Sequence, residues 1–390
     1  MVGKKITVLQ ILPDLETGGV EQGTLELGNF LVAYGHTSLV ISRGGRMVED
    51  LVSGGSQHIF MPFIGEKSPR PLGHIPALRR LLQKVDVVHL RSRVPAWAGW
   101  LAWKSLPEKK RPLLITTFHG VYSVNSYSAI MTKGERVIAV SDAILQHILA
   151  NYSMDPERLI RIPRGADSRR FDPGLVSAEK REAIRKEWGC GQDSPLILVP
   201  GRFSRIKGQD FVLQAMEGLR ELPWQLVFVG DPAENPAYAE ELGRMASGFG
   251  KRIVLAGYRK DMPEVMAASD LVLSPSRQPE SFGRVLAEAG MMEKPVLASA
   301  HGGSLEIVED GRTGLLFSPE DEDDFRKKLQ ILLQNDAVRE SMGKEAGRRI
   351  RAHFTIEAMC CKTLELYLTV LEEKKGPGWQ QGGENRRIPQ

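Results

Sequence analysis

The chain has 390 residues, of which 42% are hydrophobic and 26% charged, a composition that builds a globular core and excludes a wholly disordered protein. It contains no run of about 18 apolar residues that could form a transmembrane helix, and its first residues, MVGKKITVLQILPD, lack the features of a signal peptide. With three cysteines, two of them adjacent, neither a disulfide framework nor a zinc site is expected, and a reducing cytoplasm fits best.

The net charge of +4 is unevenly distributed along the chain. Residues 1–170 carry 22 Lys and Arg against 14 Asp and Glu, whereas the remaining residues carry 30 against 34. A basic front half indicates an anionic partner, such as nucleic acid, anionic lipid or a phosphorylated substrate. An ordinary solvated surface explains the same excess equally well.

The first half alternates short apolar strands with stretches of helical spacing. A strand over 5–12 precedes a helix over 19–34, and further buried strands are predicted over 38–42, 85–90, 113–118 and 136–140. Repeated βα units imply a mostly parallel, doubly wound sheet. Residues 1–170 are therefore predicted to form an α/β, Rossmann-like domain.

Proline and glycine concentrate after residue 163, which predicts a linker over 171–194 with a charged helical stretch over 177–188. The strand–helix pattern then restarts and predicts a second Rossmann-like domain over 195–354, with strands over 196–200, 224–229, 252–256, 271–275 and 295–299. Ser318 is predicted to cap a helix over 318–335. An amphipathic helix over 355–373 follows, and the tail 374–390 is predicted to be disordered because it has few apolar residues.

Ligands of doubly wound sheets bind beyond the carboxyl ends of the strands, so the loops that follow strands are the candidate ligand sites. Gly18 and Gly19 stand just before the first helix, where backbone N–H groups can approach an anion. An ordinary glycine turn is the alternative. His119 ends another apolar strand and could exchange a proton near neutral pH, although a structural or merely exposed histidine is equally consistent with the pattern.

Two further loops lie in the second predicted domain. In GRFSRIKG, Arg202 and Lys207 could hold a diphosphate, whereas the alternative is a solvated basic loop. In Glu280-Ser281-Phe282-Gly283, the glutamate precedes a helix that carries Glu288. Two carboxylates can accept hydrogen bonds from hydroxyl groups, such as those of a hexose and a ribose. Alternatively, neither binds a ligand: Glu280 is a charge that stabilises the helix end, and Glu288 is an ordinary surface residue.

Together these motifs resemble the retaining glycosyltransferases of family 4, which have the GT-B fold. The matching pieces are GGVE, TFHG, AVS at 139–141, IPRGAD at 162–167, GRFSRIKG and ESFGRVLAE. The resemblance covers about residues 5–372, and its specific part is the glutamate pair combined with GR…KG. It implies two Rossmann-like domains that face each other across a cleft.

The resemblance also implies roles for individual residues. Arg202 and Lys207 would neutralise the diphosphate of a nucleotide-sugar donor, and Glu288 would bind the ribose hydroxyls. Glu280, with the backbone at 282–283, would hold the donor sugar. In the first domain, Gly19 would let the backbone approach the diphosphate and His119 would contact the donor sugar near its reacting centre. The helix over 355–373 would cross back to the first domain.

One segment departs from the family pattern. Many relatives have histidine and serine after the fourth strand, whereas this chain has His89-Leu90-Arg91-Ser92-Arg93. With the Pro95-Ala96-Trp97 that follows, it resembles a bacterial subgroup linked to lipopolysaccharide assembly. Arg91 and Arg93 are either structural or bind an acceptor phosphate. The expected acceptor is a lipopolysaccharide or another glycan or glycolipid of the cell envelope.

Three tryptophans at helical spacing, Trp97, Trp100 and Trp103, precede a basic run that ends at Arg111. Tryptophan favours the membrane interface, and basic residues attract anionic headgroups. The pattern predicts peripheral, salt-sensitive binding to the inner face of the cytoplasmic membrane. Alternatively, the tryptophans pack in the core and the basic loop is ordinary surface.

No DxD motif ends a strand, so no obligatory metal is expected, and no cofactor beyond the nucleotide-sugar donor. No carboxylate stands out as a covalent nucleophile, which favours same-face attack with the leaving phosphate as base. Two other functions stay open: a nucleotide-sugar epimerase of the same fold and a non-catalytic scaffold. A nucleic-acid partner is not expected, because no aromatic and basic stacking platform is evident.

Overall fold

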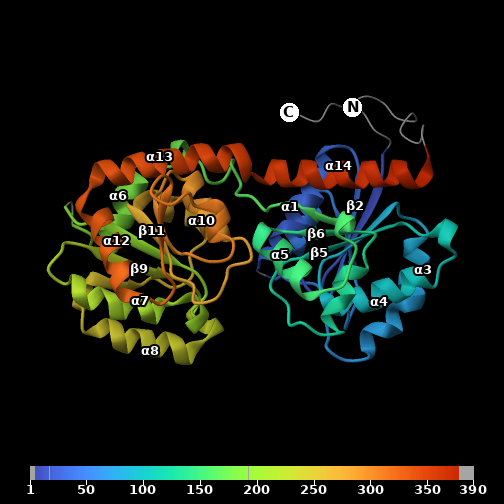
Figure 1. The fold of residues 1–390 in the computed structure, drawn as a ribbon, viewed down its shortest axis with the longest axis horizontal. Helices are drawn as coiled ribbons and strands as arrows, with labels where there is room; N and C mark the ends of the chain where they lie inside the picture. The colour runs from blue at the N-terminus through green and yellow to red at the C-terminus, as the bar shows by residue number, and fades with distance from the viewer. Residues whose placement is uncertain (1–4, 17, 192, 377–390) are drawn as a thin grey trace. The chain divides into compact units, whose positions relative to one another are not determined.

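The structure, a computed structural model, describes residues 5–16, 18–191 and 193–376. The chain divides into two compact units (Figure 1). Unit 1 comprises residues 1–164 and 356–390, and unit 2 comprises residues 165–355. Each unit is a parallel sheet with helices on both faces, so the doubly wound α/β architecture predicted from the sequence is confirmed.

Unit 1 contains a seven-stranded sheet in the order β3-β2-β1-β4-β5-β6-β7, with every pairing parallel. The strands are β1 (Thr7–Ile11), β2 (Thr37–Ser42), β3 (Gln57–Phe60), β4 (Val87–Leu90), β5 (Leu113–Phe118), β6 (Arg136–Ala139) and β7 (Leu159–Arg161). The strand order reverses between β1 and β4, and ligands of such sheets bind at the carboxyl ends beside this reversal.

Two layers of helices bury the faces of this sheet. One face packs against α3 (Ile75–Leu82), α4 (Arg93–Lys104) and α5 (Asp142–Asn151), and the other against α1 (Gly19–Ala33), α2 (Val48–Ser53) and α14 (Ile356–Lys375). Helix α14 comes from the far end of the described chain, and five of its side chains are buried with those of β1, β4, β5 and α1: Cys360, Leu364, Tyr367, Val370 and Leu371. This apolar burial joins the last helix to unit 1.

Unit 2 contains a six-stranded parallel sheet in the order β10-β9-β8-β11-β12-β13. Its strands are β8 (Leu196–Pro200), β9 (Gln225–Val229), β10 (Ile253–Leu255), β11 (Leu271–Ser274), β12 (Val296–Ser299) and β13 (Gly314–Phe317). One face packs against α7 (Gln209–Met216), α8 (Pro236–Ser247) and α12 (Glu322–Gln334). The other packs against α6 (Ala178–Glu187), α9 (Met262–Ala268), α10 (Arg284–Met291), α11 (Ser304–Ile307) and α13 (Asp336–His353).

The segment 171–194, expected to be a linker, differs from that expectation. Its helical stretch is confirmed as α6, but four side chains of the segment are buried in the apolar cluster of unit 2: Phe171, Val176, Ile184 and Trp188. The apolar residues are spaced among prolines, glycines and charges, which hid this packing in the sequence. In the expected tail, Lys374 and Lys375 belong to α14, and residues 377–390 lie outside the described residues.

The predicted cap at Ser318 is wrong. Helix α12 begins at Glu322, and the Asp321 carboxylate accepts the backbone N–H of Asp324 at 3.0 Å. An aspartate at the N-cap satisfies a free helix N–H and adds a favourable charge, so it displaces the start by three residues. The sequence analysis also missed α13, which begins after Asn335, whose side chain accepts the N–H of Val338.

Candidate active site

The predicted residues of unit 1 gather at the carboxyl edge of its sheet. Arg91 directly follows β4, His119 directly follows β5, and Gly18 and Gly19 begin α1 after β1. Because β1, β4 and β5 are neighbours, their ends lie side by side. His119, Arg91 and Gly23 line one small cavity of about 20 Å³, which is room for a single water molecule.

His119 makes one side-chain hydrogen bond within the described chain. Its Nδ1 lies 2.5 Å from Nη2 of Arg164, whereas its buried Nε2 has no partner among residues 5–16, 18–191 and 193–376. Burial lowers the pKa of His119 well below its ordinary value, and the positive charges of Arg164 and Arg91 lower it further. The ring is therefore neutral at neutral pH, which argues against the proton exchange expected from the sequence.

Arg164 was quoted in the IPRGAD motif but was not predicted as a site residue. The residue is 7% exposed, and its guanidinium donates to the Gly19 carbonyl oxygen as well as to His119. A side chain at Gly23 would place its Cβ 3.0 Å from Nη2 of Arg91 and 3.4 Å from Nη1 of Arg164. Glycine at position 23 thus lets both guanidinium groups approach α1.

The two arginines of the unusual HLRSR segment have different surroundings. Arg91 is 5% exposed, and its Nη1 donates to Oε1 of Gln10 at 3.1 Å. Arg93 lies in the first turn of α4, donates to Oγ of Ser128 at 3.1 Å and stands 4.4 Å from the centre of the Tyr122 ring. Arg91 therefore shares the cavity of His119, whereas Arg93 is held by the loop that follows β5.

In unit 2 the structure brings Lys207 and Glu280 into direct contact. Nζ of Lys207 lies 2.5 Å from Oε1 of Glu280, which also accepts the hydroxyl of Ser276 at 2.5 Å. Burial alone would raise the pKa of Glu280, but the charge and hydrogen bond of Lys207 and the bond from Ser276 together hold it below its ordinary value. Arg202 is exposed and forms no side-chain hydrogen bond or ion pair with a described residue.

The two residues just before α10, Phe282 and Gly283, are buried. Phe282 is 3% exposed and packs against Phe354, with 5.9 Å between the ring centres. Gly283 adopts the left-handed conformation, with φ 96°, at the start of α10. On that helix, Glu288 accepts a hydrogen bond at 3.1 Å from Nη2 of Arg284. Phe282 and Gly283 are both buried, so the expected role of their main chain in holding a donor sugar stays a prediction.

The loop after β12 is a part of the site that the sequence analysis missed. The Gly303 N–H donates to the carbonyl oxygen of Glu280 at 2.7 Å, and any side chain at Gly303 would collide with the carbonyl oxygen of Phe282. Both ring nitrogens of His301 are buried without a hydrogen-bond partner in the described parts of the chain. A histidine and two glycines after an apolar strand are the same kind of signal that singled out Gly18 and Gly19.

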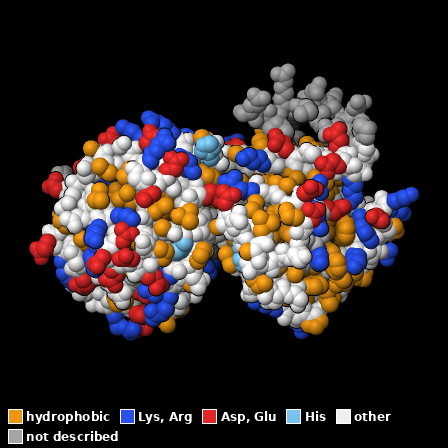
Figure 2. Space-filling model, in the orientation of Figure 1, with side chains coloured by type: hydrophobic (Ala, Val, Ile, Leu, Met, Phe, Trp, Pro, Cys, Tyr) orange, Lys and Arg blue, Asp and Glu red, His pale blue; other side chains and the backbone are white. Residues whose placement is uncertain are grey.

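The three tryptophans of α4 lie partly buried against the apolar cluster of unit 1. The indole N–H groups of Trp97 and Trp103 donate to the carbonyl oxygens of Tyr127 and Pro112. Nζ of Lys104 lies 4.8 Å from the centre of the Trp100 ring. Figure 2 shows Lys and Arg side chains beside apolar ones on the face of unit 1 that carries α3 and α4. These contacts favour the alternative in which the tryptophans pack against the core of unit 1.

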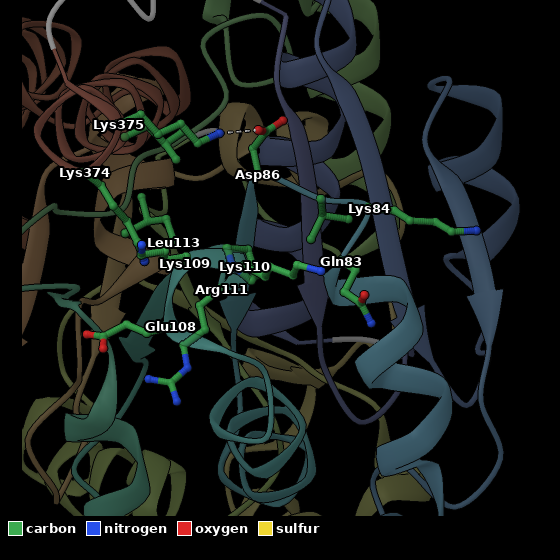
Figure 3. Close-up of a pocket in the computed structure, with 13 residues that line it drawn as sticks. Gln83, Lys84, Asp86, Glu108, Lys109, Lys110, Arg111, Leu113, Lys374 and Lys375 are labelled. Carbon is green, nitrogen blue, oxygen red and sulfur yellow. Dashed lines mark hydrogen bonds and ion pairs between the residues drawn. The ribbon is translucent and has the colours of Figure 1, made fainter.

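A basic pocket of about 600 Å³ lies at the opposite, amino end of the same sheet (Figure 3). It is formed by the segments before β4 and β5 and by the end of α14, and it has six basic lining residues: Lys84, Lys109, Lys110, Arg111, Lys374 and Lys375. Nζ of Lys375 pairs with Oδ1 of Asp86 at 2.8 Å, as the dashed line in Figure 3 shows. Its position at the other end of the strands separates this pocket from the candidate active site.

No group of three or more His, Cys, Asp or Glu side chains in the described ranges is arranged to hold a metal ion. None of the helices in those ranges combines the length and hydropathy that a membrane-spanning helix requires.

Comparison with known proteins agrees with this geometry. Residues 17–170 match the family profile described as Glycosyltransferase Family 4, and residues 180–349 match the profile described as Glycosyl transferases group 1. A D-inositol 3-phosphate glycosyltransferase of Xylanimonas cellulosilytica is 31% identical over 72% of this chain and 71% of its own.

Solved structures agree as well. A glycosyltransferase of Rickettsia africae is 31% identical and superimposes with a TM-score of 0.87, covering 94% of this chain and 99% of its own. HepE of Anabaena, solved with UDP-glucose, is 21% identical with a TM-score of 0.79, covering 93% of this chain and 100% of its own. With its two doubly wound units, its glycine and glutamate motifs and these relatives, the chain belongs to the family 4 glycosyltransferases and has the GT-B fold.

Proposed function

We propose that the protein transfers a sugar from a nucleoside-diphosphate sugar to a phosphorylated glycan or glycolipid, with retention of configuration and without a metal ion. The observation that carries this proposal is the contact of Lys207 with Glu280 at the carboxyl end of the unit 2 sheet. It places a cation suited to a diphosphate beside a carboxylate suited to sugar hydroxyls. Arg202, exposed in the same loop, supplies a second cation.

The proposed chemistry is governed by the charge of the leaving group. Departure of the sugar leaves negative charge on the diphosphate, which Lys207 and Arg202 stabilise electrostatically. Glu280 and the backbone of 282–283 hold the sugar, and Glu288 holds the ribose. Glu280 is bound by Lys207 and has a lowered pKa, which suits hydrogen-bond acceptance. A leaving phosphate oxygen then takes the proton of the acceptor hydroxyl as the new bond forms on the same face.

The donor base and sugar are proposed from the relatives. HepE of Anabaena was solved with UDP-glucose, so UDP-sugars are the first donors to test. A nucleotide-sugar epimerase would bind the same donors but release an isomer without an acceptor. A scaffold protein would bind or ignore them without any turnover.

Two observations in unit 1 support a phosphorylated acceptor with an apolar portion. Arg91 is a buried cation that faces the cavity of His119 and hydrogen-bonds to a neutral amide oxygen. A pocket of about 580 Å³, lined mainly by apolar side chains that include Leu72, Trp97 and Tyr127, lies among the loops at the carboxyl edge of the sheet. A lipopolysaccharide core or another envelope glycolipid would use both features, whereas D-inositol 3-phosphate would use only the first.

The assignment can be tested in two steps with the purified full chain. A thermal-shift screen of nucleotide sugars identifies the donor, and incubation of that donor with lipid A-core glycolipid or with D-inositol 3-phosphate identifies the acceptor by product mass. We expect a mass gain of one sugar on the glycolipid, with the anomeric configuration of the donor, in the presence of EDTA. Donor isomerisation without a product, or the absence of donor binding and turnover, would reject the proposal.

We also propose that the basic pocket of unit 1 touches anionic membrane surfaces. Lys84, Lys109 and Lys110 have no ion-pair partner in the described residues, and each basic residue near such a surface contributes about 1 kcal/mol. Co-sedimentation with phosphatidylglycerol vesicles should occur at low salt and disappear at high salt. Loss of binding in Lys109→Ala/Lys110→Ala, but not in the exposed-lysine control Lys251→Ala of unit 2, would locate the contact.

A further inference from the structure

The hydrogen bond between Arg164 and His119 determines which ring nitrogen of the histidine carries a proton. A guanidinium group has five N–H donors and no acceptor, and it remains charged in proteins. Nη2 of Arg164 lies 2.5 Å from Nδ1 of His119, so Nδ1 must offer its lone pair. The proton of the neutral ring is then on Nε2.

We infer that Arg164 is a positioning residue that holds His119 as a neutral, permanent Nε2–H donor, so that His119 binds a ligand oxygen and does not act as a base. The inference rests on the proposed function for the identity of that oxygen, which belongs to the donor or the acceptor. Nε2 is buried and has no protein partner within the described ranges. A buried N–H without a partner is costly, and a ligand oxygen would satisfy it.

The groups that face His119 all favour this state. Arg164 and Arg91 place positive charge beside the ring, and neutral His89 lies nearby. The Tyr122 hydroxyl accepts the backbone N–H of His119 at 3.4 Å and leaves the ring nitrogens untouched. Protonation of Nδ1 would remove the acceptor of Arg164 and add a third positive charge. The neutral tautomer therefore persists through the pH range in which an ordinary histidine titrates.

Arg164 is itself held in place from a second direction. Its Nη1 donates to the Gly19 carbonyl oxygen at the start of α1, so one guanidinium spans the histidine and the helix. Burial at 7% exposure and the close approach to Gly23 restrict its other orientations. Outer partners that orient a histidine in this way typically contribute 10- to 100-fold to the function of the ring, by analogy with metal-bound histidines.

The tautomer can be measured without substrate and without activity. Ring-¹⁵N-labelled histidine in the full chain gives separate signals for protonated and unprotonated nitrogens, and His119→Gln identifies the signals of residue 119. We expect Nε2 to be protonated and Nδ1 to be unprotonated from pH 5 to 8 in the wild-type protein. A protonated Nδ1, or a His119 titration within this range, would overturn the inference even if sugar transfer is confirmed.

A matched pair of variants tests the role of Arg164. Arg164→Met removes every donor, whereas Arg161→Met removes a guanidinium that pairs with Asp142, and neither of these two residues lines the cavity. In Arg164→Met we expect mixed tautomers, a higher histidine pKa because one positive charge is gone, and a kcat lower by roughly 10- to 100-fold. Arg161→Met should keep the wild-type signals and kcat. An unchanged tautomer in folded Arg164→Met would overturn the inference.

Discussion

The two units present cations at the carboxyl ends of their sheets, but they compensate the charge differently. In unit 1, Arg91 hydrogen-bonds to the neutral amide oxygen of Gln10, and its guanidinium forms no ion pair with a described residue. In unit 2, Lys207 contacts the carboxylate of Glu280. The buried positive charge of Arg91 is balanced only through space, by Glu26 and Glu21, whereas that of Lys207 directly contacts a carboxylate.

This difference has a consequence for ligand binding. An anion that binds beside Arg91 gains its interaction without displacing a protein carboxylate. A diphosphate that binds Lys207 must share the ammonium group with Glu280 or displace it, and Glu280 then needs new donors, such as sugar hydroxyls. Diphosphate and sugar would therefore bind cooperatively in unit 2, because each restores the partner that the other removes.

The largest expected effect comes from breaking the unit 2 pair. Lys207→Ala and Arg202→Ala should each lower kcat/KM about 10- to 100-fold, because a charge-assisted contact contributes about 1.5–3 kcal/mol. Lys251→Ala, at an exposed lysine of the same unit, is the control and should transfer normally. Urea unfolding verifies that the variants remain folded. Near-normal turnover in both site variants would reject the assigned roles.

The next effect separates the two glutamates. Glu288→Gln should weaken binding of the free nucleoside diphosphate at least tenfold, because the ribose loses a charged acceptor. Glu280→Gln should chiefly weaken binding of the intact sugar donor. Calorimetry with both ligands measures the difference. Equal losses for both ligands would contradict this division of roles.

A third prediction contrasts two lysines of unit 2. The ammonium group of Lys294 donates to the carbonyl oxygen of Ala267. Burial lowers the pKa of Lys294 from 10.5 to about 8; the negative charge of Asp270 opposes this shift, and the positive charges of nearby arginines increase it. Because the unfolded state keeps its proton up to a higher pH, stability should rise between pH 8 and 10.5.

Lys294→Met should therefore stabilise the protein by about 1–2 kcal/mol at pH 7, after allowance for partial exposure, and by less at pH 10. It should leave transfer unchanged, since Lys294 is not in the candidate site. Urea unfolding at both pH values makes the test. A variant that is destabilised at pH 7 would show that Lys294 is as well compensated as Lys207.

The smallest expected effect concerns the start of α12. Asp321→Ala should cost about 1 kcal/mol, because it removes the side chain that accepts the N–H of Asp324, whereas Ser318→Ala should change stability by less than about 0.5 kcal/mol. Thermal unfolding of both variants compares the observed cap with the one expected from the sequence. A larger loss of stability in Ser318→Ala than in Asp321→Ala would show that Ser318 caps the helix, as the sequence predicted.

Strong apolar runs made most of the strands predictable. Strands such as β5 and β8 are almost wholly buried and bounded by polar residues, so each is visible in the sequence as a short apolar run. The edge strands β3 (QHIF), β7 (LIR) and β13 (GLLF) were missed because they are short, and β3 and β7 are also only partly buried. Lys207 and Glu280 could be predicted to lie in loops after strands, where ligands of such sheets bind, and their roles stay predictions.

Other parts of the site depend on contacts between distant segments. Arg164 lies 45 residues from His119 in the sequence; it follows β7 and His119 follows β5, and the sheet brings the ends of both strands to one edge. The pairing of Lys207 with Glu280 spans 73 residues. Sequence patterns predicted which residues lie at the strand ends, but the hydrogen bonds between them follow from side-chain conformations and burial, which a pattern does not encode.

The return of α14 to unit 1 has a consequence for synthesis on the ribosome. Unit 2 is contiguous over 165–355, whereas the sheet of unit 1 needs Leu364, Tyr367 and Leu371 to cover one face. At about 5–20 residues per second, unit 1 waits many seconds for this cover after β1 emerges. During that time an apolar surface is exposed on the nascent chain, so unit 2 can complete its fold before unit 1 does.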